Sequence, residues 1–288
     1  MPKVSYDVIA ASKPFRFLVG PDKKECFMHA NLVARMSKPL WTLVNGKWKE
    51  SEGCLVDWSD VDEETFVRFC EFSYTGYYQA AEPFSIEPPT PTPPEGKESD
   101  KRRMETPSKS IPLMIEEPAP ELMVRDSWGT LMRPPKKITT TSKKDVMLDD
   151  FKRYVDEAVP DSAPSEASNT NPLMNYSEVF LSHARLYAFA DCYAIDDLTK
   201  LCIRRLHRAL LNFNLHGGTR AADVAKLIDF SYKNTRSDTV KQDKLRGLLS
   251  AYIACHVEEI WPNLYFRDVI ELGEVANDII GKLLRRLD

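Results

Sequence analysis

The sequence contains no apolar run of the roughly 18 to 20 residues that a membrane-spanning helix needs. Its first residues, MPKVSYDVIAASKPF, lack the apolar core of a secretory signal. Glycine is scarce, with 11 in 288 residues, and none falls in the GxGxxG or GxxxxGKS/T patterns of phosphate-binding loops. These absences argue against a membrane protein and against a nucleotide-binding enzyme. We expect an intracellular chain, in the cytoplasm, the nucleus or both.

The sequence also has no large excess of positive or negative charge, because 28% of its residues are charged but the formal net charge is only -4. Proteins that bind nucleic acid through its backbone usually show a concentrated basic face. The six cysteines are widely scattered and contain no CxxC pair. This usage is typical of reduced thiols that mostly fill core positions. We therefore expect neither a nucleic-acid partner nor a disulfide.

No catalytic or metal-binding constellation is complete in the sequence. The histidines, at positions 29, 183, 207, 216 and 256, are spread along the chain, and none lies in a known nucleophile signature. Cys26 and His29 form a lone C-x-x-H, whereas a closed zinc site needs about four ligands. On a strand, moreover, residues three apart point to opposite faces. We expect Cys26 to be a small buried side chain, His29 to mark the end of a strand, and the protein to have no catalytic residue, metal or cofactor.

Proline is concentrated in one stretch, since 15 of the 20 prolines lie between positions 83 and 172. A segment without amide donors or a regular apolar period cannot bury enough surface to offset chain entropy. We predict a mostly disordered insertion over residues 83–175. One helix is expected inside it, at 143–159, because Leu148, Phe151, Val155 and Ala158 share one helical stripe after Ser142 as a cap.

The same stretch holds a basic cluster, Lys101, Arg102 and Arg103. Neighbouring acidic residues, such as Glu98 and Glu105, dilute its charge. Short basic clusters are common by chance. The sequence leaves open whether this one is a nuclear signal or a solvated tail of mixed charge.

The part before the insertion alternates strands and helices. Residues 15–20 and 24–29 predict a hairpin across a turn at Pro21 and Asp22. Apolar residues between 32 and 44 follow helical spacing, interrupted by Pro39, with Asn45-Gly46 as a left-handed stop, so two short helical pieces are expected. Residues 54–58 are a third strand, and Asp62 caps a helix that ends at Gly76.

After the insertion we expect only helices, at 177–193, 196–213, 220–234, 241–260 and 265–287 with a break near Gly273. The stretch IRRLHRALL, 203–211, is expected to carry its basic residues on the outer face of an amphipathic helix. We also expect the block that ends at Tyr78 and the block that begins near Ser177 to close into one folded body.

Three tyrosines in SYTGYY, at positions 74, 77 and 78, form the candidate partner surface together with Thr75. Tyrosine offers a large contact area at low entropic cost and is enriched at protein interfaces. The alternative is that these rings pack on the helices that follow. The sequence does not decide between the two.

These ordered motifs resemble a BTB/POZ domain, of the type common in filamentous fungi. The resemblance begins with a hairpin and a histidine that opens a helix with Leu and then Ser, here His29, Leu32 and Ser37. It continues with a capped helix that ends in Tyr-Thr-Gly, here Tyr74, Thr75 and Gly76. It ends with a closing helix pair at residues 183–210. The expected fold is α+β, with a small sheet packed on helices. Its parts would be 13–82, the insertion 83–175, the closing helices 176–214, and an all-helical C-terminal extension, 215–288.

The resemblance implies a non-catalytic protein–protein interaction module, with other proteins as partners. Many BTB domains self-associate, and many are substrate adaptors of cullin-type ubiquitin ligases. The alternative is a scaffold or nuclear regulatory protein that acts through motifs in the linker without a cullin. The identity of the partner and the oligomeric state stay open.

Overall fold

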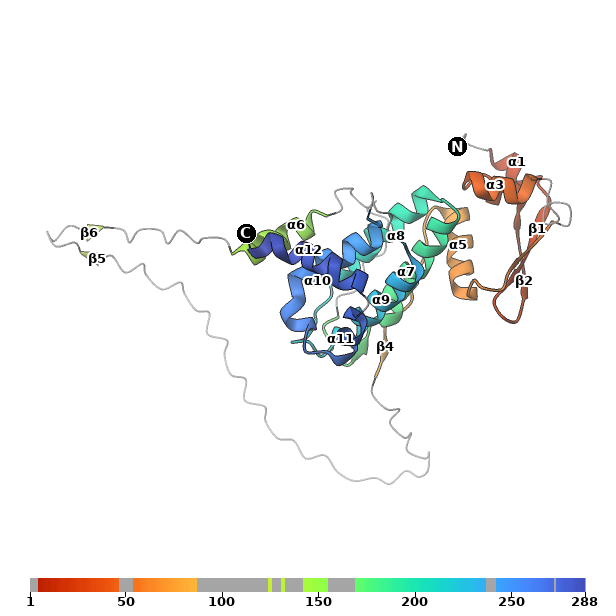
Figure 1. The fold of residues 1–288 in the computed structure, drawn as a ribbon. Helices are drawn as coiled ribbons and strands as arrows, with labels where there is room; N and C mark the ends of the chain where they lie inside the picture. Colours follow the sequence, from red (N-terminus) through yellow and green to blue (C-terminus); the bar gives the residue numbers. More distant parts are fainter. Residues whose placement is uncertain are drawn as a thin grey trace, which may run out of the picture. The chain divides into compact units, whose positions relative to one another are not determined.

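The computed structural model describes residues 5–46, 54–86, 124–125, 131–132, 142–154, 169–236, 242–271 and 273–287 (Figure 1). The chain divides into two units, residues 1–87 with 142–288, and residues 88–141. In the second unit, strands β5 (Val124–Arg125) and β6 (Leu131–Met132) pair antiparallel. The first unit is of mixed α+β class and contains every other element described below.

A three-stranded sheet of order β2-β1-β3 opens the first unit. Strands β1 (Pro14–Val19) and β2 (Lys24–His29) form the predicted hairpin, and β3 (Leu55–Trp58) runs parallel to β1. Alternate residues of β1, namely Phe15, Phe17 and Val19, are buried, which is the pattern of a strand with one face on a core.

Three short helices accompany the sheet: α1 (Tyr6–Ala10), which the sequence did not predict, α2 (Ala30–Ala34) and α3 (Lys38–Asn45). The two short helical pieces predicted around Pro39 are therefore present as α2 and α3, and Pro39 lies in the first turn of α3, where a missing amide costs nothing. The predicted left-handed stop at Asn45-Gly46 is wrong, because Gly46 is extended, with φ -68°. Its amide still donates to the carbonyl of Thr42, at 2.8 Å, so α3 ends without a left-handed residue.

Helix α5 (Glu63–Thr75) joins the sheet to the helices that follow the insertion. Trp58 of β3 and Phe69 of α5 both contact Phe189 of α7 (Ser177–Cys192), with ring centroids 5.2 and 5.0 Å apart. Segments more than a hundred residues apart in sequence therefore share one aromatic core, and Figure 1 shows α5 beside α7.

Helices make up the rest of the described C-terminal part, close to their predicted ranges. They are α8 (Asp196–Leu211), α9 (Ala221–Asn234), α10 (Lys244–Ile260), α11 (Leu264–Ile270) and α12 (Gly273–Leu287). The expected break near Gly273 is present as the boundary between α11 and α12. No helix in the part of the chain that the structure describes has both the length and the apolar character needed to cross a bilayer.

The predicted limits of the insertion, 83 and 175, are wrong at both ends. Strands β4 (Phe84–Ser85) and β7 (Met174–Asn175) pair antiparallel, so the chain leaves and re-enters the folded unit at the same place. Asn169 is buried and exchanges hydrogen bonds with Asn214, of 2.8 and 2.6 Å. These contacts form between residues distant in sequence, which local composition cannot reveal.

The helix expected at 143–159 is present as α6 (Lys143–Lys152), with Ser142 and Asp145 forming a capping box. Residues 155–159 lie outside the described part of the chain, and so do the basic cluster at 101–103 and most of the stretch predicted to be disordered.

Candidate functional site

The end of α5 is the centre of the candidate site. Asp62 caps the start of this helix by accepting a hydrogen bond of 2.8 Å from the amide of Thr65, as predicted. Phe66, Phe69 and Ser73 are buried, and their spacing turns the next residue, Tyr74, to the edge of that face. Tyr74 is 41% exposed. The helix thus presents an aromatic side chain at its end while its opposite face is held in the core.

Gly76 allows the chain to turn sharply after the helix, because its φ of +77° is the left-handed conformation that closes many helices. The Thr75 hydroxyl donates to the carbonyl of Glu71, at 2.7 Å, and accepts from the amide of Tyr77, at 3.1 Å. The Glu71 carboxylate accepts from the amide of Gln79, also at 2.7 Å. The turn is therefore braced on both sides by side chains of α5.

Tyr78 was predicted to belong to a partner surface, but it is completely buried. Its hydroxyl lies 2.7 Å from Nδ1 of His183 in α7. The guanidinium of Arg205, in α8, lies 4.6 Å from the ring centres of both Tyr77 and Tyr78, and it also donates to the Tyr78 carbonyl. Tyr77 is half-buried by the same contact. The rings of Tyr77 and Tyr78 therefore pack on the helices that follow the insertion, which was the alternative to a partner surface.

The buried environment keeps His183 neutral. Burial lowers the pKa of its imidazole well below the usual value, and the charges of Arg205 and Arg68 lower it further. A neutral ring can exchange a hydrogen bond with the Tyr78 hydroxyl without placing another charge beside the guanidinium. The cluster therefore stabilises the fold.

Tyr74 and Thr75 remain on the surface, and His29 supports the first of them. Nδ1 of His29 lies 2.8 Å from the Tyr74 hydroxyl. His29 stands at the end of β2 and immediately before α2, where the sequence placed it. Its imidazole is thus engaged by a tyrosine and orients an exposed ring.

The thiols near this end of the sheet are not arranged for metal binding. Burial, with a contribution from Cys26, raises the pKa of the Cys70 thiol to about 12, so it stays protonated at neutral pH. Cys202 and Cys255 are buried as expected, whereas Cys26, which was expected to be buried, is only half-buried at the edge of the core, like Cys54 and Cys70, and Cys192 is exposed. Among the described residues no three His, Cys, Asp or Glu side chains lie close enough to hold an ion.

A groove of about 690 Å³ lies beside the exposed end of α5. Its walls come from the α2–α3 connection, the end of α5 and the α7–α8 connection: residues 35–39, Phe72, Ser73, Gly76, residues 194–197 and Lys200. Arg35 ties two walls together by donating to the Ser73 carbonyl, at 3.1 Å. Two further cations and two carboxylates line it: Lys38, Lys200, Asp196 and Asp197.

The side chains of the groove leave few groups of the usual nucleophilic types free. Among the described residues that line it, none is a histidine or a cysteine. Its two serines are both occupied, since Ser37 caps α3 and the Ser73 hydroxyl donates to the Phe69 carbonyl. Mixed charges around a partly apolar floor are suited to a polypeptide segment.

The five histidines do not converge on one site. His207 lies 2.7 Å from the carbonyl of Phe151, His216 lies 2.9 Å from the carbonyl of Asn169, and His256 lies 3.6 Å from the carboxylate of Glu259. Burial lowers the pKa of both His207 and His256. Each ring serves a separate local contact.

Arg205, which supports the turn after α5 from inside the fold, is buried, contrary to the prediction from the sequence. Residues 203–211 were expected to carry their basic side chains outward, yet Arg205 and His207 are both buried. Arg205 follows Cys202 by three positions and precedes Ala209 by four, so it shares their buried face. That spacing was the available signal, whereas the tyrosines that cover the guanidinium lie far away in sequence.

In comparisons with known proteins, no protein-family model matches the chain, and no curated protein matches it.

Proposed function

We propose that this chain is a protein-interaction module of the BTB/POZ type. The order of its elements supports the assignment: a hairpin, two short helices, a parallel strand and a capped helix, then, after the insertion, the helix pair α7 and α8. His29, Tyr74, Thr75 and Gly76, which carry the resemblance, lie together around the end of α5. In this proposal the function comes from a surface rather than from a reaction.

The observation that carries the proposal is the braced end of α5 beside the groove. Tyr74 is held by His29, and the turn after it is held by Thr75 and Glu71, so the surface is organised before any partner arrives. Pre-organised aromatic side chains are the usual anchors of protein interfaces. A groove with both signs of charge adds a means of selecting the bound segment.

We further propose a cullin-type ubiquitin ligase scaffold as the partner, with this chain as its substrate adaptor. The N-terminal region of a cullin, purified and immobilised, should bind the full-length protein at micromolar concentration. Tyr74→Ala should weaken binding by about tenfold or more, as expected of a central aromatic anchor. Asp197→Lys, which reverses a charge in the groove, should also weaken it.

The matched control is Tyr6→Ala, which removes an exposed tyrosine from α1 instead. It should leave the affinity unchanged. Equal losses in Tyr6→Ala and Tyr74→Ala would show that the α5 end is not the interface. Absence of binding to every cullin tested at micromolar concentration would remove the adaptor role.

A scaffold that acts through linker motifs without a cullin is the competing proposal. The limits of the second unit make a cleaner deletion possible, because removing residues 88–141 keeps α6 and the β4–β7 pair. The adaptor role predicts that cullin binding survives this deletion. The scaffold role predicts that partners captured by the full-length chain are lost.

A further inference from the structure

Helix α6 packs against the C-terminal helices, although most of the chain on both sides of it lies outside the described residues. Phe151 is buried, with its ring centre 4.9 Å from that of His207 in α8 and 5.5 Å from that of Tyr252 in α10. The carbonyl of Phe151 accepts a hydrogen bond of 2.7 Å from Nε2 of His207. These contacts fix one end of α6 and define the wall of a hollow.

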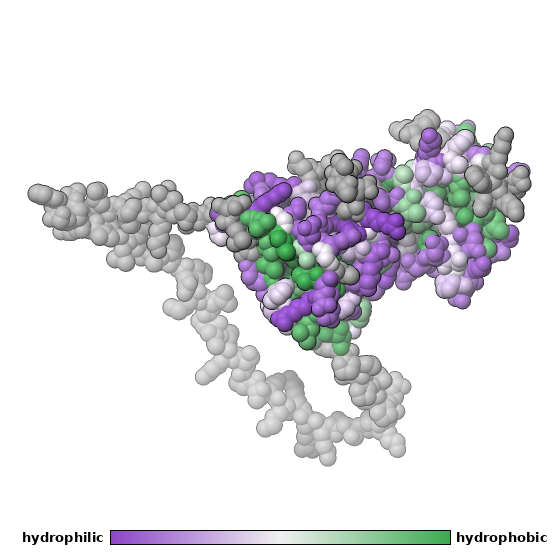
Figure 2. All heavy atoms as spheres, viewed as in Figure 1, coloured by the Kyte–Doolittle hydropathy of each residue, from purple (hydrophilic) through white to green (hydrophobic). Residues whose placement is uncertain are grey.

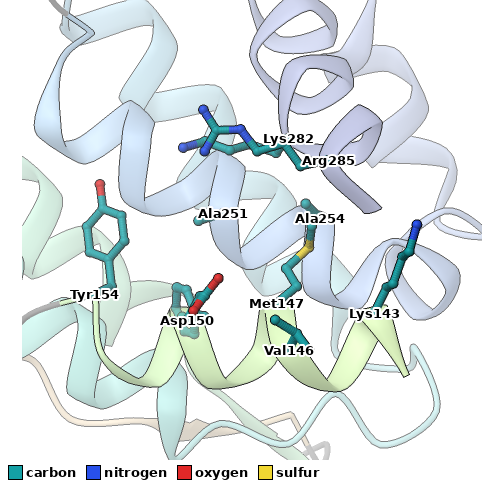
Figure 3. Close-up of a pocket in the computed structure, with 10 residues that line it drawn as sticks. Lys143, Val146, Met147, Asp150, Tyr154, Ala251, Ala254, Lys282 and Arg285 are labelled. Carbon is teal, nitrogen blue, oxygen red and sulfur yellow. The ribbon is translucent and has the colours of Figure 1, made fainter. Parts of the chain in front are cut away.

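The hollow lies between α6, α10 and α12 and has a volume of about 430 Å³ (Figure 3). Met147 and Phe151 of α6 and Ala251 and Ala254 of α10 give it an apolar lining. The two alanines leave the space open, since a larger side chain at either position would extend into it. Figure 2 shows hydrophobic surface gathered over α10 and α12 at this end of the unit.

Cations dominate the rim of the hollow. Lys282 and Arg285 lie three residues apart on α12, so they project from the same side of that helix, and Lys143 lies on α6 (Figure 3). Asp150 is the one acidic residue in the lining. Within the described part of the chain, neither Lys282 nor Arg285 forms an ion pair. Burial lowers the pKa of Lys282, the charge of Arg285 lowers it further, and the charge of Asp278, one turn earlier on α12, partly opposes this shift.

Lys282 is half-buried and Arg285 is exposed, so an anion placed between their two charges would form charge-assisted contacts with both. A lining that is mainly apolar, with a few convergent charged groups, is typical of small-molecule sites, and the volume lies in the usual range of about 300–1,000 Å³. A ligand that satisfies both features has an apolar body and one anionic group.

We propose that the hollow between α6, α10 and α12 binds a small amphiphilic anion, with its acyl or aryl body against Met147 and Ala251 and its carboxylate, sulfonate or phosphate on Lys282 and Arg285. The inference is independent of the proposed function, because the groove beside α5 shares no residue with this hollow. Such a ligand has two sources, a free amphiphile such as a fatty acid or the headgroup region of an anionic lipid surface.

Calorimetric titration of the full-length protein with dodecanoate tests the proposal, with dodecanol as the uncharged analogue. Dodecanoate should bind at least about tenfold more tightly than dodecanol, because a charge-assisted contact with an arginine or lysine is replaced by a neutral one. Lys282→Gln combined with Arg285→Gln should weaken dodecanoate about tenfold or more and leave dodecanol unchanged.

Lys226→Gln is the matched control, because it removes an exposed lysine from α9, outside the hollow. Equal effects of this control and of the double variant would overturn the proposal, as would equal affinity for dodecanoate and dodecanol.

Asp150→Asn should strengthen dodecanoate binding several-fold, since it removes the opposing charge. Ala251→Leu should weaken both probes by filling the space, and its melting temperature shows whether the variant is folded.

Flotation with vesicles of phosphatidylcholine, with and without phosphatidylserine, separates the two sources. Flotation that needs phosphatidylserine and is lost in the double variant identifies a lipid surface as the source. Binding of dodecanoate without flotation identifies a free amphiphile. Absence of binding in both arms overturns the proposal.

Discussion

The sheet with α5 and the bundle of α7 to α12 bury different kinds of side chain. Around the sheet the core is aromatic: Phe17 lies 4.8 Å from Trp58 and 5.2 Å from Phe66 between ring centres. In the bundle, buried charges accompany the apolar residues. Arg220 and Asp223 form a buried ion pair, and the guanidinium of Arg246 donates to the carbonyls of Tyr232 and Thr235.

The buried charges of the bundle hold the ends of its helices. Asp223 accepts a hydrogen bond of 2.9 Å from the amide of Tyr176, at the start of α7. Arg246 reaches the residues that end α9 and also pairs with Glu274 at the start of α12. The comparison shows that both parts rely on packing volume and on helix caps, whereas, among the described residues, only in the bundle does a buried ion pair connect helix ends.

The largest effect is expected from Asp223→Ala. This change leaves Arg220 buried without its carboxylate and removes the acceptor of the Tyr176 amide. Breaking a buried pair by deleting one partner typically costs about 3–5 kcal/mol, and we expect about 4 kcal/mol here. Denaturant unfolding of the two proteins measures the difference. The double variant Arg220→Met with Asp223→Leu should be less destabilised than Asp223→Ala; a larger loss in the double variant would contradict the account.

Phe69→Ala tests the aromatic half. The ring of Phe69 lies 5.0 Å from that of Phe189 and 6.1 Å from that of Trp58, so its removal leaves a cavity between α5 and α7. We expect a loss of about 3 kcal/mol in the free energy of unfolding. Phe69→Leu, which keeps most of the volume, should cost less than about 1.5 kcal/mol. Equal losses would mean that volume does not govern this core.

The smallest effects come from two glycines that differ only in backbone conformation. A Cβ would meet no atom within 4 Å at Gly76 or at Gly281, yet Gly76 has φ +77° and Gly281 lies inside α12. Gly76→Ala should destabilise the protein by about 1 kcal/mol, because an L-residue is strained there. Gly281→Ala should stabilise it by about 0.5–1 kcal/mol. Thermal unfolding measures both, and changes of the same sign would refute the conformational explanation.

Local patterns predicted much of the fold and little of the site. The start of α5 at Asp62 and its end at Gly76 were predicted because caps act within a few residues. Tyr74 is exposed, while its role in a partner surface stays a prediction. The burial of Tyr78 could not be predicted, because its partner Arg205 is 127 positions away, and nothing near either residue indicates the contact.

The sequence by itself determined the three-stranded sheet and the longer helices, since apolar period, capping residues and turn residues act over short distances. It did not predict α1 or the β4–β7 pair. Only the tertiary structure decided which polar side chains are buried, where the insertion leaves the fold, and that α6 closes a hollow with α10 and α12. The physical reason is that burial of Arg205, or pairing of Phe84 with Asn175, depends on surfaces supplied by remote segments.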